Sequence, residues 1–288
     1  MRVVARLCGV ALISIALLIA PASAAAAGNA DTAALQVALR AVGTYAGTVD
    51  GVAGAGTARA VRAFQSRNGL TADGVAGAST RRALGRRGGP SFGSRTLRAG
   101  MSGWDVAALQ FRLAWRGFPS GSMDGGYGSH VVAAVRRFQA YAGLSADGVA
   151  GPGTLNALRG PIPRSPIWLV APIRYRIGDG FGPRGNGFHP GVDYPAPAGT
   201  RVTAAGRGRV VFAGWDSGGY GNLVVIEHPQ GVRSMYAHLS RIDVGSGRWV
   251  VAGTPVGAVG ATGFATGPHL HFELRLRGAA LNPLTALR

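Results

Sequence analysis

Cysteine is nearly absent from this sequence of 288 residues, in which Cys8 is the only one. Cys8 lies before an apolar run, whereas a lipid-modified cysteine would have to follow it. The rest of the chain can form neither a disulfide nor a cysteine-based zinc site. Its stability therefore has to come from burial, or from a metal ion held by histidine and carboxylate.

Lysine is absent altogether, and acidic residues are few. The 30 basic residues are all arginine and face only 12 Asp and Glu, which gives a formal net charge of +18. Such a charge indicates an anionic partner, either a nucleic acid or an anionic bacterial envelope. The arginines are spread along the chain without a dense basic run and interleaved aromatics, which argues against nucleic acid.

The N-terminal apolar run is too short to span a bilayer comfortably. Arg2 and Arg6 precede this run, Val10–Ala20, and the residues Ala22–Ala24 offer a small-residue cleavage site. This order is typical of a secretory signal, which we assign to residues 1–27. The alternative is a retained membrane anchor.

The first half of the chain contains an internal repeat with an offset of 74 residues. The segment LQVALRAVGTYAGTVDG from Leu35 corresponds to LQFRLAWRGFPSGSMDG from Leu109. The segment AVRAFQSRNGLTADGVAG from Ala60 corresponds to AVRRFQAYAGLSADGVAG from Ala134. Similarity at one fixed offset predicts two copies of one folding unit. Apolar residues at helical spacing and recurring Asp-Gly turns predict short helices in each copy, with Thr57 as the N-cap of one of them.

The repeated pattern LQ…L…G…DG…G…AV..FQ…GL..DG..G..T..AL resembles the type-1 peptidoglycan-binding domain, a three-helix module. We expect one module over residues 31–85 and a second over 97–159, with linkers at 86–96 and 160–170. The resemblance implies binding to the bacterial cell wall but does not identify the binding residues.

From about residue 167, short runs rich in Val, Ile and Phe alternate with Gly and Pro. The runs are 209–213, 222–227, 249–252, 255–259 and 270–276. Runs of this kind with turn signals between them predict antiparallel strands. We therefore expect a multidomain chain, in which two small three-helix all-α modules precede an all-β domain of antiparallel sheet over residues 171–288.

Histidines are concentrated in this second half, which holds five of the six: His189, His228, His238, His269 and His271. His269 and His271 are two residues apart in a predicted strand, so their imidazoles point to the same face. His189 and Asp193 are four residues apart around a Pro-Gly pair, and His238 lies near the end of another apolar run.

Hydrolysis at a zinc ion calls for a set of this kind. A catalytic zinc takes three protein ligands, such as imidazoles and a carboxylate, and keeps a fourth position for water. The ion activates that water and polarises the scissile carbonyl, while further groups handle the proton and the developing oxyanion. Such a site would use four of the five histidines. The alternative for any single histidine is a hydrogen-bonded structural role.

Five motifs follow one another in the second half: FGPR at 181–184, HPGVD at 189–193, GGYGNLVVIEH at 218–228, YAHLS at 236–240 and GPHLHFEL at 267–274. With these motifs, the segment from 172 to 284 resembles the lysostaphin/LytM-type peptidoglycan zinc metallopeptidases. The resemblance implies a β-sheet groove with one Zn²⁺ ion at its floor.

The resemblance also implies roles for the residues at the motif positions. His189, Asp193 and His271 match the metal ligands of the family. His238 and His269 match its catalytic histidines, which orient or activate water and act as base or oxyanion stabiliser. The sequence does not divide these two roles between His238 and His269.

Four further residues have weaker claims to the site. Glu273 shares a strand face with His271, so it either supports that histidine or is a salt-bridged carboxylate of the sheet. Tyr236 either lines the groove or packs in the core. We interpret His228 as a loop residue, and Arg184 as a candidate partner for a substrate carboxylate.

The sequence therefore predicts a secreted, cell-wall-associated zinc endopeptidase that hydrolyses peptide bonds of the stem or cross-bridge of bacterial peptidoglycan. Its expected partners are peptidoglycan, as substrate and anchor, and anionic wall polymers; we expect no nucleic acid and no stable membrane insertion after signal cleavage. The alternative is a catalytically silent wall-binding regulator of the same fold, although such relatives lose ligands and all five positions are filled here. A nucleic-acid-binding protein would explain the charge but not the histidines.

Overall fold

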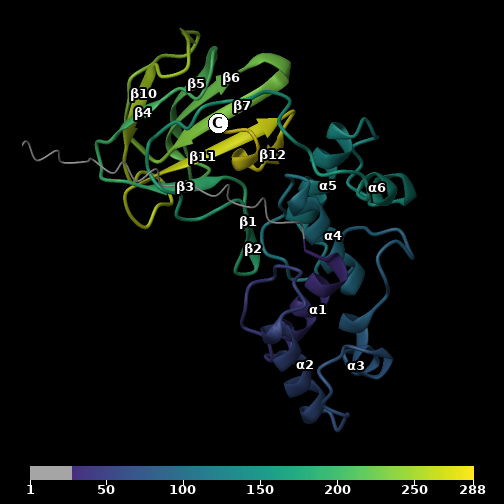
Figure 1. The fold of residues 1–288 in the computed structure, drawn as a ribbon. Helices are drawn as coiled ribbons and strands as arrows, with labels where there is room; N and C mark the ends of the chain where they lie inside the picture. Colours follow the sequence, from purple (N-terminus) through teal and green to yellow (C-terminus); the bar gives the residue numbers. More distant parts are fainter. Residues whose placement is uncertain (1–27) are drawn as a thin grey trace, which may run out of the picture.

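The computed structural model describes residues 28–288 (Figure 1). The predicted signal segment, residues 1–27, lies outside the described residues. Within residues 28–288, no helix combines the length and the apolar character that crossing a membrane requires. Helices and strands form two parts that lie side by side, which we call the helical region (residues 30–157) and the β region (residues 182–281).

The helical region consists of two successive three-helix units. Its helices are α1 (Ala30–Ala41), α2 (Ala55–Arg67), α3 (Ala78–Ala83), α4 (Trp104–Trp115), α5 (Ser129–Tyr141) and α6 (Pro152–Ala157), with a 3-10 turn η1 (Gly85–Gly88). The two units pack on each other through α1 and α4, where Trp104 Nε1 donates a hydrogen bond of 2.8 Å to Asp31 Oδ1.

A buried glutamine closes each Asp-Gly turn of the repeat. Its side-chain amide donates to the aspartate Oδ1, and its carbonyl accepts the amide N–H of the glycine that follows. The four glutamines are Gln36, Gln65, Gln110 and Gln139, all at most 2% exposed. The prediction of Thr57 as an N-cap is wrong, because α2 begins at Ala55 after Gly54, and Thr57 Oγ1 accepts from Gln36 instead.

Gln65 tests how much this network stabilises a unit. Its Nε2 also donates to Val75 O and Thr80 Oγ1. Gln65→Ala removes four hydrogen bonds, one of them to the buried Thr80 hydroxyl, so we expect a loss of about 1–3 kcal/mol of unfolding free energy. Ser66→Ala, an exposed neighbour on the same helix, should change it by less than about 0.5 kcal/mol. Urea denaturation followed by the helical circular dichroism signal measures the unfolding free energy of both variants. An equal loss of unfolding free energy in the two would contradict the prediction.

The β region is built of antiparallel strands in three sheets. The strands are β1 (Gly182–Arg184), β2 (Gly187–His189), β3 (Val192–Pro195), β4 (Arg201–Thr203), β5 (Gly208–Asp216), β6 (Gly221–Glu227), β7 (Val232–Ala237), β8 (Leu239–Ile242), β9 (Trp249–Val250), β10 (Pro255–Val259), β11 (His269–Leu276) and β12 (Ala279–Leu281). Short 3-10 turns are η2 (Pro229–Gly231) and η3 (Pro283–Thr285). The predicted fold class, two helical modules followed by an antiparallel β domain, is confirmed.

Strand β11 organises the largest sheet, whose order is β12-β11-β7-β6-β5-β9. It pairs along one edge with β7, and along the other with β3 in its first half and β12 in its second. Side chains of this sheet and of the smaller sheet β4-β10-β8 share one apolar core. This burial fixes the register of β11, because a slip of one residue would turn its core residues to solvent.

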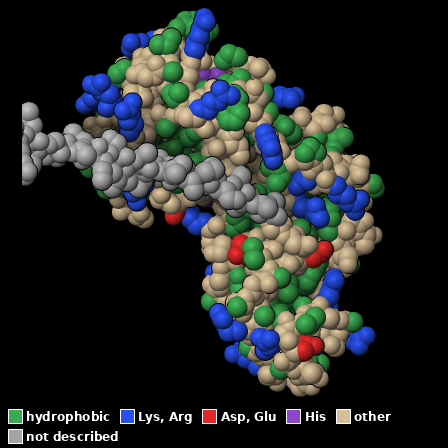
Figure 2. All heavy atoms as spheres, in the orientation of Figure 1, with side chains coloured by type: hydrophobic (Ala, Val, Ile, Leu, Met, Phe, Trp, Pro, Cys, Tyr) green, Lys and Arg blue, Asp and Glu red, His purple; other side chains and the backbone are tan. Residues whose placement is uncertain are grey.

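The hairpin β1–β2 forms a separate two-stranded sheet and lies between the helical region and the larger sheet (Figure 1). Basic side chains, all of them arginine, are spread over both parts of the molecule, as Figure 2 shows for one face. This distribution agrees with the absence of a dense basic run in the sequence.

Candidate metal centre

The pairing of β3 with β11 brings Asp193 and His271 together. The register places Asp193 directly opposite His271, and side chains opposite each other on antiparallel strands lie within contact distance. His271 Nδ1 is 2.7 Å from Asp193 Oδ1. His269 precedes His271 by two residues on the same face, and its Nε2 is 3.8 Å from the same oxygen.

His189 reaches this point from the end of β2. Its side chain is 2% exposed, and Nδ1 donates a 2.9 Å hydrogen bond to Gly180 O, which leaves Nε2 directed at the other two residues. The turn that follows needs glycine at position 191, since a Cβ there would lie 2.5 Å from Phe272 O and 2.9 Å from His271 Cε1. Gly191 thus lets the HPGVD turn lie against β11.

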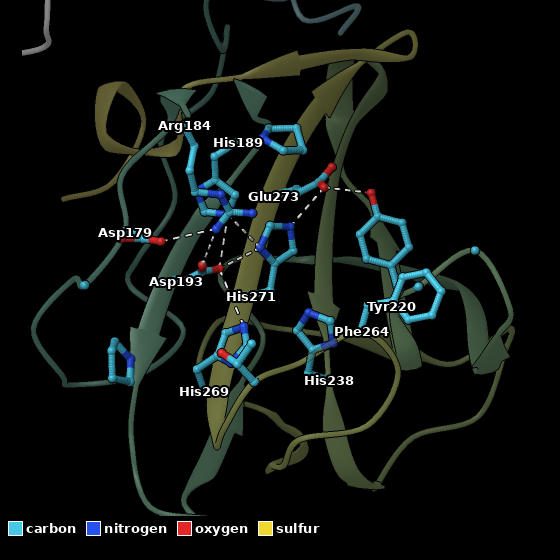
Figure 3. Close-up of a pocket in the computed structure, with 16 residues that line it drawn as sticks. Asp179, Arg184, His189, Asp193, Tyr220, His238, Phe264, His269, His271 and Glu273 are labelled. Carbon is cyan, nitrogen blue, oxygen red and sulfur yellow. Dashed lines mark hydrogen bonds and ion pairs between the residues drawn. The ribbon is translucent and has the colours of Figure 1, made fainter. Parts of the chain in front are cut away.

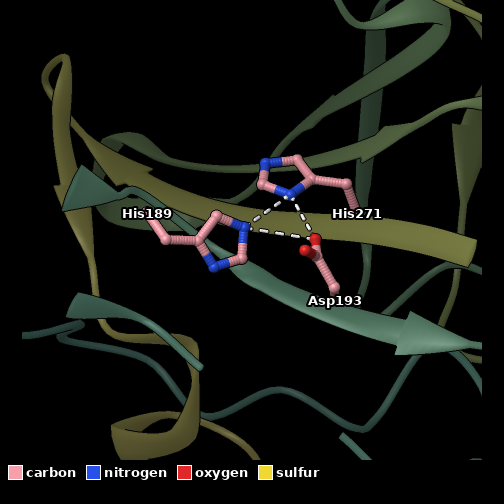
Figure 4. A group of neighbouring side chains, drawn as sticks. All are labelled: His189, Asp193 and His271. Atoms are coloured by element: carbon pink, nitrogen blue, oxygen red, sulfur yellow. Dashed lines mark hydrogen bonds and ion pairs between the residues drawn. The ribbon is translucent and has the colours of Figure 1, made fainter. Parts of the chain in front are cut away.

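Three ligand atoms converge in this way (Figure 4). His189 Nε2 is 3.1 Å from His271 Nδ1 and 3.2 Å from Asp193 Oδ1. The three residues form the one group of at least three potential metal ligands found among residues 28–288. The sequence therefore predicted a set of side chains that the fold brings together from β2, β3 and β11.

The donor set fits a small divalent cation. Ligand bonds of about 2.0–2.1 Å in tetrahedral geometry separate the ligand atoms by about 3.3 Å, close to the spacing here. The other ring nitrogens of His189 and His271 donate to Gly180 O and Glu273 Oε1. Two imidazole lone pairs and a carboxylate thus face one point, and this arrangement calls for a positive charge there.

Glu273 lies behind His271 and is completely buried. Its Oε1 accepts from His271 Nε2 at 3.0 Å and from the Tyr220 hydroxyl at 2.7 Å. Its Oε2 accepts from Arg275 Nε at 2.8 Å. Both interpretations of Glu273 therefore hold at once: it is salt-bridged, and it supports His271. Tyr220, which the sequence analysis did not single out, belongs to the same network.

Burial and charge act in opposite directions on the pKa values of this cluster. Burial lowers the pKa of His271, but hydrogen bonds to Asp193 and Glu273 raise it to about 9. Burial raises the pKa of Glu273, but His271 and Arg275 lower it to about 2. In Asp193, burial likewise raises the pKa, and the hydrogen bonds with His189 and His271 hold it well below its ordinary value.

The other two candidate histidines lie beside the cluster (Figure 3). The ring centroids of His238 and His269 are 4.7 Å apart, and that of His238 is 5.8 Å from that of His271. The Nδ1 atom of His238 donates to Thr262 O, and that of His269 donates to Gly267 O. Because a carbonyl only accepts, each neutral ring keeps Nε2 as a lone-pair acceptor. Burial lowers the pKa of His238 and so favours its neutral form.

All five residues line one open cavity of about 610 Å³ (Figure 3). Arg184 also lines it, and its guanidinium lies 3.5 Å from Asp193 and 3.2 Å from Asp179. Phe264 stands at the cavity with 84% of its surface exposed. No sequence pattern indicated Asp179 or Phe264, because each lies in a loop whose position depends on tertiary contacts.

Two residues with weaker claims turn out to be structural. Tyr236 is completely buried, and its hydroxyl accepts from the Ala205 amide, so it packs in the core and does not line the cavity. His228 lies in the loop after β6, as predicted, but is only 4% exposed. It contacts Arg207 O and Ser234 Oγ.

An antiparallel sheet that presents two imidazoles, a carboxylate and two further histidines in one cavity has the make-up of a metallopeptidase domain. Residues 187–283 match the model of Peptidase family M23. Residues 28–84 and 102–158 each match the model of a peptidoglycan binding domain. The chain thus carries an M23 peptidase domain behind two peptidoglycan binding domains.

Several known proteins are similar to part of this chain. The DD-carboxypeptidase/endopeptidase Mpg of Neisseria meningitidis serogroup B is 44% identical over 40% of this chain and 28% of its own length. Lysostaphin of Staphylococcus simulans is 42% identical over 34% of this chain and 21% of its own length. The solved catalytic domain of that lysostaphin is 39% identical, with 38% of this chain and 90% of the domain covered and a TM-score of 0.36. The chain thus spans less than a third of the length of these two full-length relatives.

Gly191 tests the packing of the HPGVD turn. Gly191→Ala places a Cβ against the backbone of β11, which we expect to cost about 1–3 kcal/mol of stability and to separate His189 from His271. Zinc affinity, measured by competition with a chromophoric chelator, should fall by about tenfold or more. Gly187→Ala on β2 meets only an ordinary contact of 3.6 Å and serves as the control. Unchanged affinity in Gly191→Ala would refute the expectation.

Proposed function

We propose that this protein is an exported zinc endopeptidase that hydrolyses peptide bonds in the stem or cross-bridge of bacterial peptidoglycan. The convergence of His189 Nε2, His271 Nδ1 and Asp193 Oδ1 in an open cavity is the observation that carries the proposal. The two peptidoglycan binding domains support the substrate class, since they would hold the enzyme at an insoluble polymer and raise its local concentration there.

We propose His189, Asp193 and His271 as the zinc ligands. A bound zinc ion would supply Lewis-acid polarisation of the scissile carbonyl and activation of water. The residues behind the ligands orient them: Gly180 O holds the ring of His189, and Glu273 holds the ring of His271. Three protein ligands would leave one position of a tetrahedral ion for solvent or substrate, as catalysis requires.

The proposed catalytic roles of His238 and His269 follow from their lone pairs. Each ring donates through Nδ1 to a backbone carbonyl, so its Nε2 is available beside the ligand cluster to accept a proton from water or to return one to the leaving amine. Arg184, beside Asp193 at the same cavity, offers a positive charge that a substrate carboxylate can approach.

We also propose that residues 1–27 direct export and that the mature chain acts at the cell wall. The domains in this proposal are two binding modules at 31–85 and 97–159 and a catalytic domain at 171–288, with linkers at 86–96 and 160–170. The formal charge of +18 supports additional attraction to anionic wall polymers.

His189→Ala tests the enzymatic proposal. Removing one of three ligands should abolish stoichiometric zinc and lower the rate of wall clearance by about a hundredfold or more, while wall binding remains. Turbidity of purified walls measures hydrolysis, co-sedimentation measures binding, and metal analysis measures zinc. His130→Ala is the control, because His130 is exposed in the helical region.

Clearance of walls by His189→Ala at the wild-type rate would refute the metal assignment. Wall binding without zinc or hydrolysis in the wild-type chain would instead favour the silent regulator. Mass spectrometry of fragments from a defined muropeptide would identify the bond. A relative of Staphylococcus capitis is named glycyl-glycine endopeptidase ALE-1, and Mpg is named a DD-carboxypeptidase/endopeptidase, so a glycyl-glycine link and a D,D link are the first two to test.

Glu273→Gln tests the support of His271. The amide removes the negative charge that faces His271 and Arg275, so zinc affinity should fall by about 10–100-fold. Glu227→Gln is the matched control, because Glu227 is an exposed carboxylate paired with Arg233. Competition titration with a chelator measures both variants. Equal affinity in the two would mean that the charge of Glu273 does not act on the site.

A further inference from the structure

The hairpin that carries His189 is in contact with the helical region. His189 ends strand β2, and the tip of the hairpin, residues 184–187, lies against the loops that follow α1 and α4 (Figure 1). The hairpin pairs with neither of the larger sheets. Its position therefore depends on contacts other than strand pairing.

The two repeats hold the tip of the hairpin through equivalent residues. The amide of Val49 donates to Gly185 O at 2.8 Å, and the amide of Met123 donates to Asn186 O at 2.6 Å. Val49 and Met123 are related by the 74-residue offset of the repeat. Each module thus uses the same backbone position to bind one of two consecutive carbonyl groups.

Two aromatic side chains, Phe181 just before β1 and Phe188 in β2, extend the helical core. The ring centroid of Trp115 is 6.4 Å from that of Phe181 and 5.5 Å from that of Phe188, and the two phenylalanine centroids are 5.0 Å apart. All three pairs are edge to face. Trp115 ends α4 and is 6% exposed. Phe188 directly precedes His189, so this cluster fixes the backbone from which the histidine projects.

A second contact joins the same part of α4 to the β region. Gly117 O accepts from the amide of Ala280 in β12, at 3.0 Å. A Cβ on Gly117 would lie 2.2 Å from Ala280 O, so only glycine permits this approach. The equivalent glycine of the first module, Gly43, has nothing within 4 Å of its Cβ position.

The sequences of the two modules differ where the second one contacts the β region. Trp115 corresponds to Ala41 in the first module under the 74-residue offset. The scaffold of the repeat therefore does not need a large ring at this position. The tryptophan contacts Phe111 on its own helix, and beyond the helical region it contacts Phe181 and Phe188.

We infer that the helical region is a positioning element of the metal centre, in which Trp115 and the loops at Val49 and Met123 hold the β1–β2 hairpin and thereby His189. This inference rests on the proposed function only where it takes His189 as a metal ligand. The helical region would accordingly complete the support of the cavity, in addition to the wall binding proposed above.

The test compares Gly117→Ala with Gly43→Ala in the full chain. Both glycines have positive φ, 86° and 74°, so both variants carry the same local strain, but only Gly117→Ala collides with β12. Hydrogen exchange of the metal-free protein, read by mass spectrometry, should be about tenfold or more faster over residues 181–189 in Gly117→Ala. It should stay at the wild-type rate in Gly43→Ala.

Trp115→Ala and Trp115→Phe provide a second, independent pair. Ala41 ends the equivalent helix of the first module, so alanine is compatible with this helix end, and Trp115→Ala should keep the helical signal while it loosens the hairpin. Cobalt(II) affinity should fall by about tenfold, with altered visible absorption bands. Trp115→Phe should keep most of the cobalt affinity and of the wild-type absorption bands, since it keeps an aromatic ring at this position.

Wild-type exchange over residues 181–189 in both Gly117→Ala and Trp115→Ala would overturn the inference. Equal acceleration in Gly43→Ala and Gly117→Ala would overturn it too, since the effect would then come from helix strain. Because exchange is measured without metal, these results stand apart from the proposed function, whose failure would appear as a wild-type chain that neither binds zinc nor clears walls.

Discussion

Two imidazole lone pairs and one carboxylate face a single point, and most of the surrounding contacts keep them there. His189 Nε2, His271 Nδ1 and Asp193 Oδ1 lie within 3.2 Å of one another. Such a group is stable only with a positive charge among its members, either a proton or a cation. The surrounding residues, from Gly180 O to Glu273, fix which ring nitrogens point inward.

Several elements of the β region serve this convergence. Strand β11 carries two histidines on one face, and its pairing with β3 supplies the carboxylate. The buried Glu273 is balanced by Arg275 and Tyr220, so the negative charge behind His271 is not left unpaired. Gly191 allows the turn after His189 to approach β11 closely. These contacts hold the proposed ligands in place without being ligands themselves.

The helical region repeats one scaffold but uses its two copies differently. Both copies close their Asp-Gly turns with a buried glutamine and offer one loop amide to the hairpin tip. Only the second copy adds Trp115 and a backbone contact with β12. The second copy thus carries contacts to the β region that the equivalent residues of the first copy, Ala41 and Gly43, do not make.

The helical repeat and the antiparallel strands could be predicted from the chain alone, since periodicity and a fixed repeat offset can be read along it. The five candidate residues could be named because their motifs resemble those of a known family. The sequence left open whether Glu273 was a sheet carboxylate or a support for His271, misassigned the cap of α2 at Thr57, and passed over Tyr220. The packed fold was needed to resolve these points and to reveal the docking of Trp115 on the hairpin. Each depends on contacts between segments up to about 70 residues apart, whose geometry is set by packing and not by local pattern.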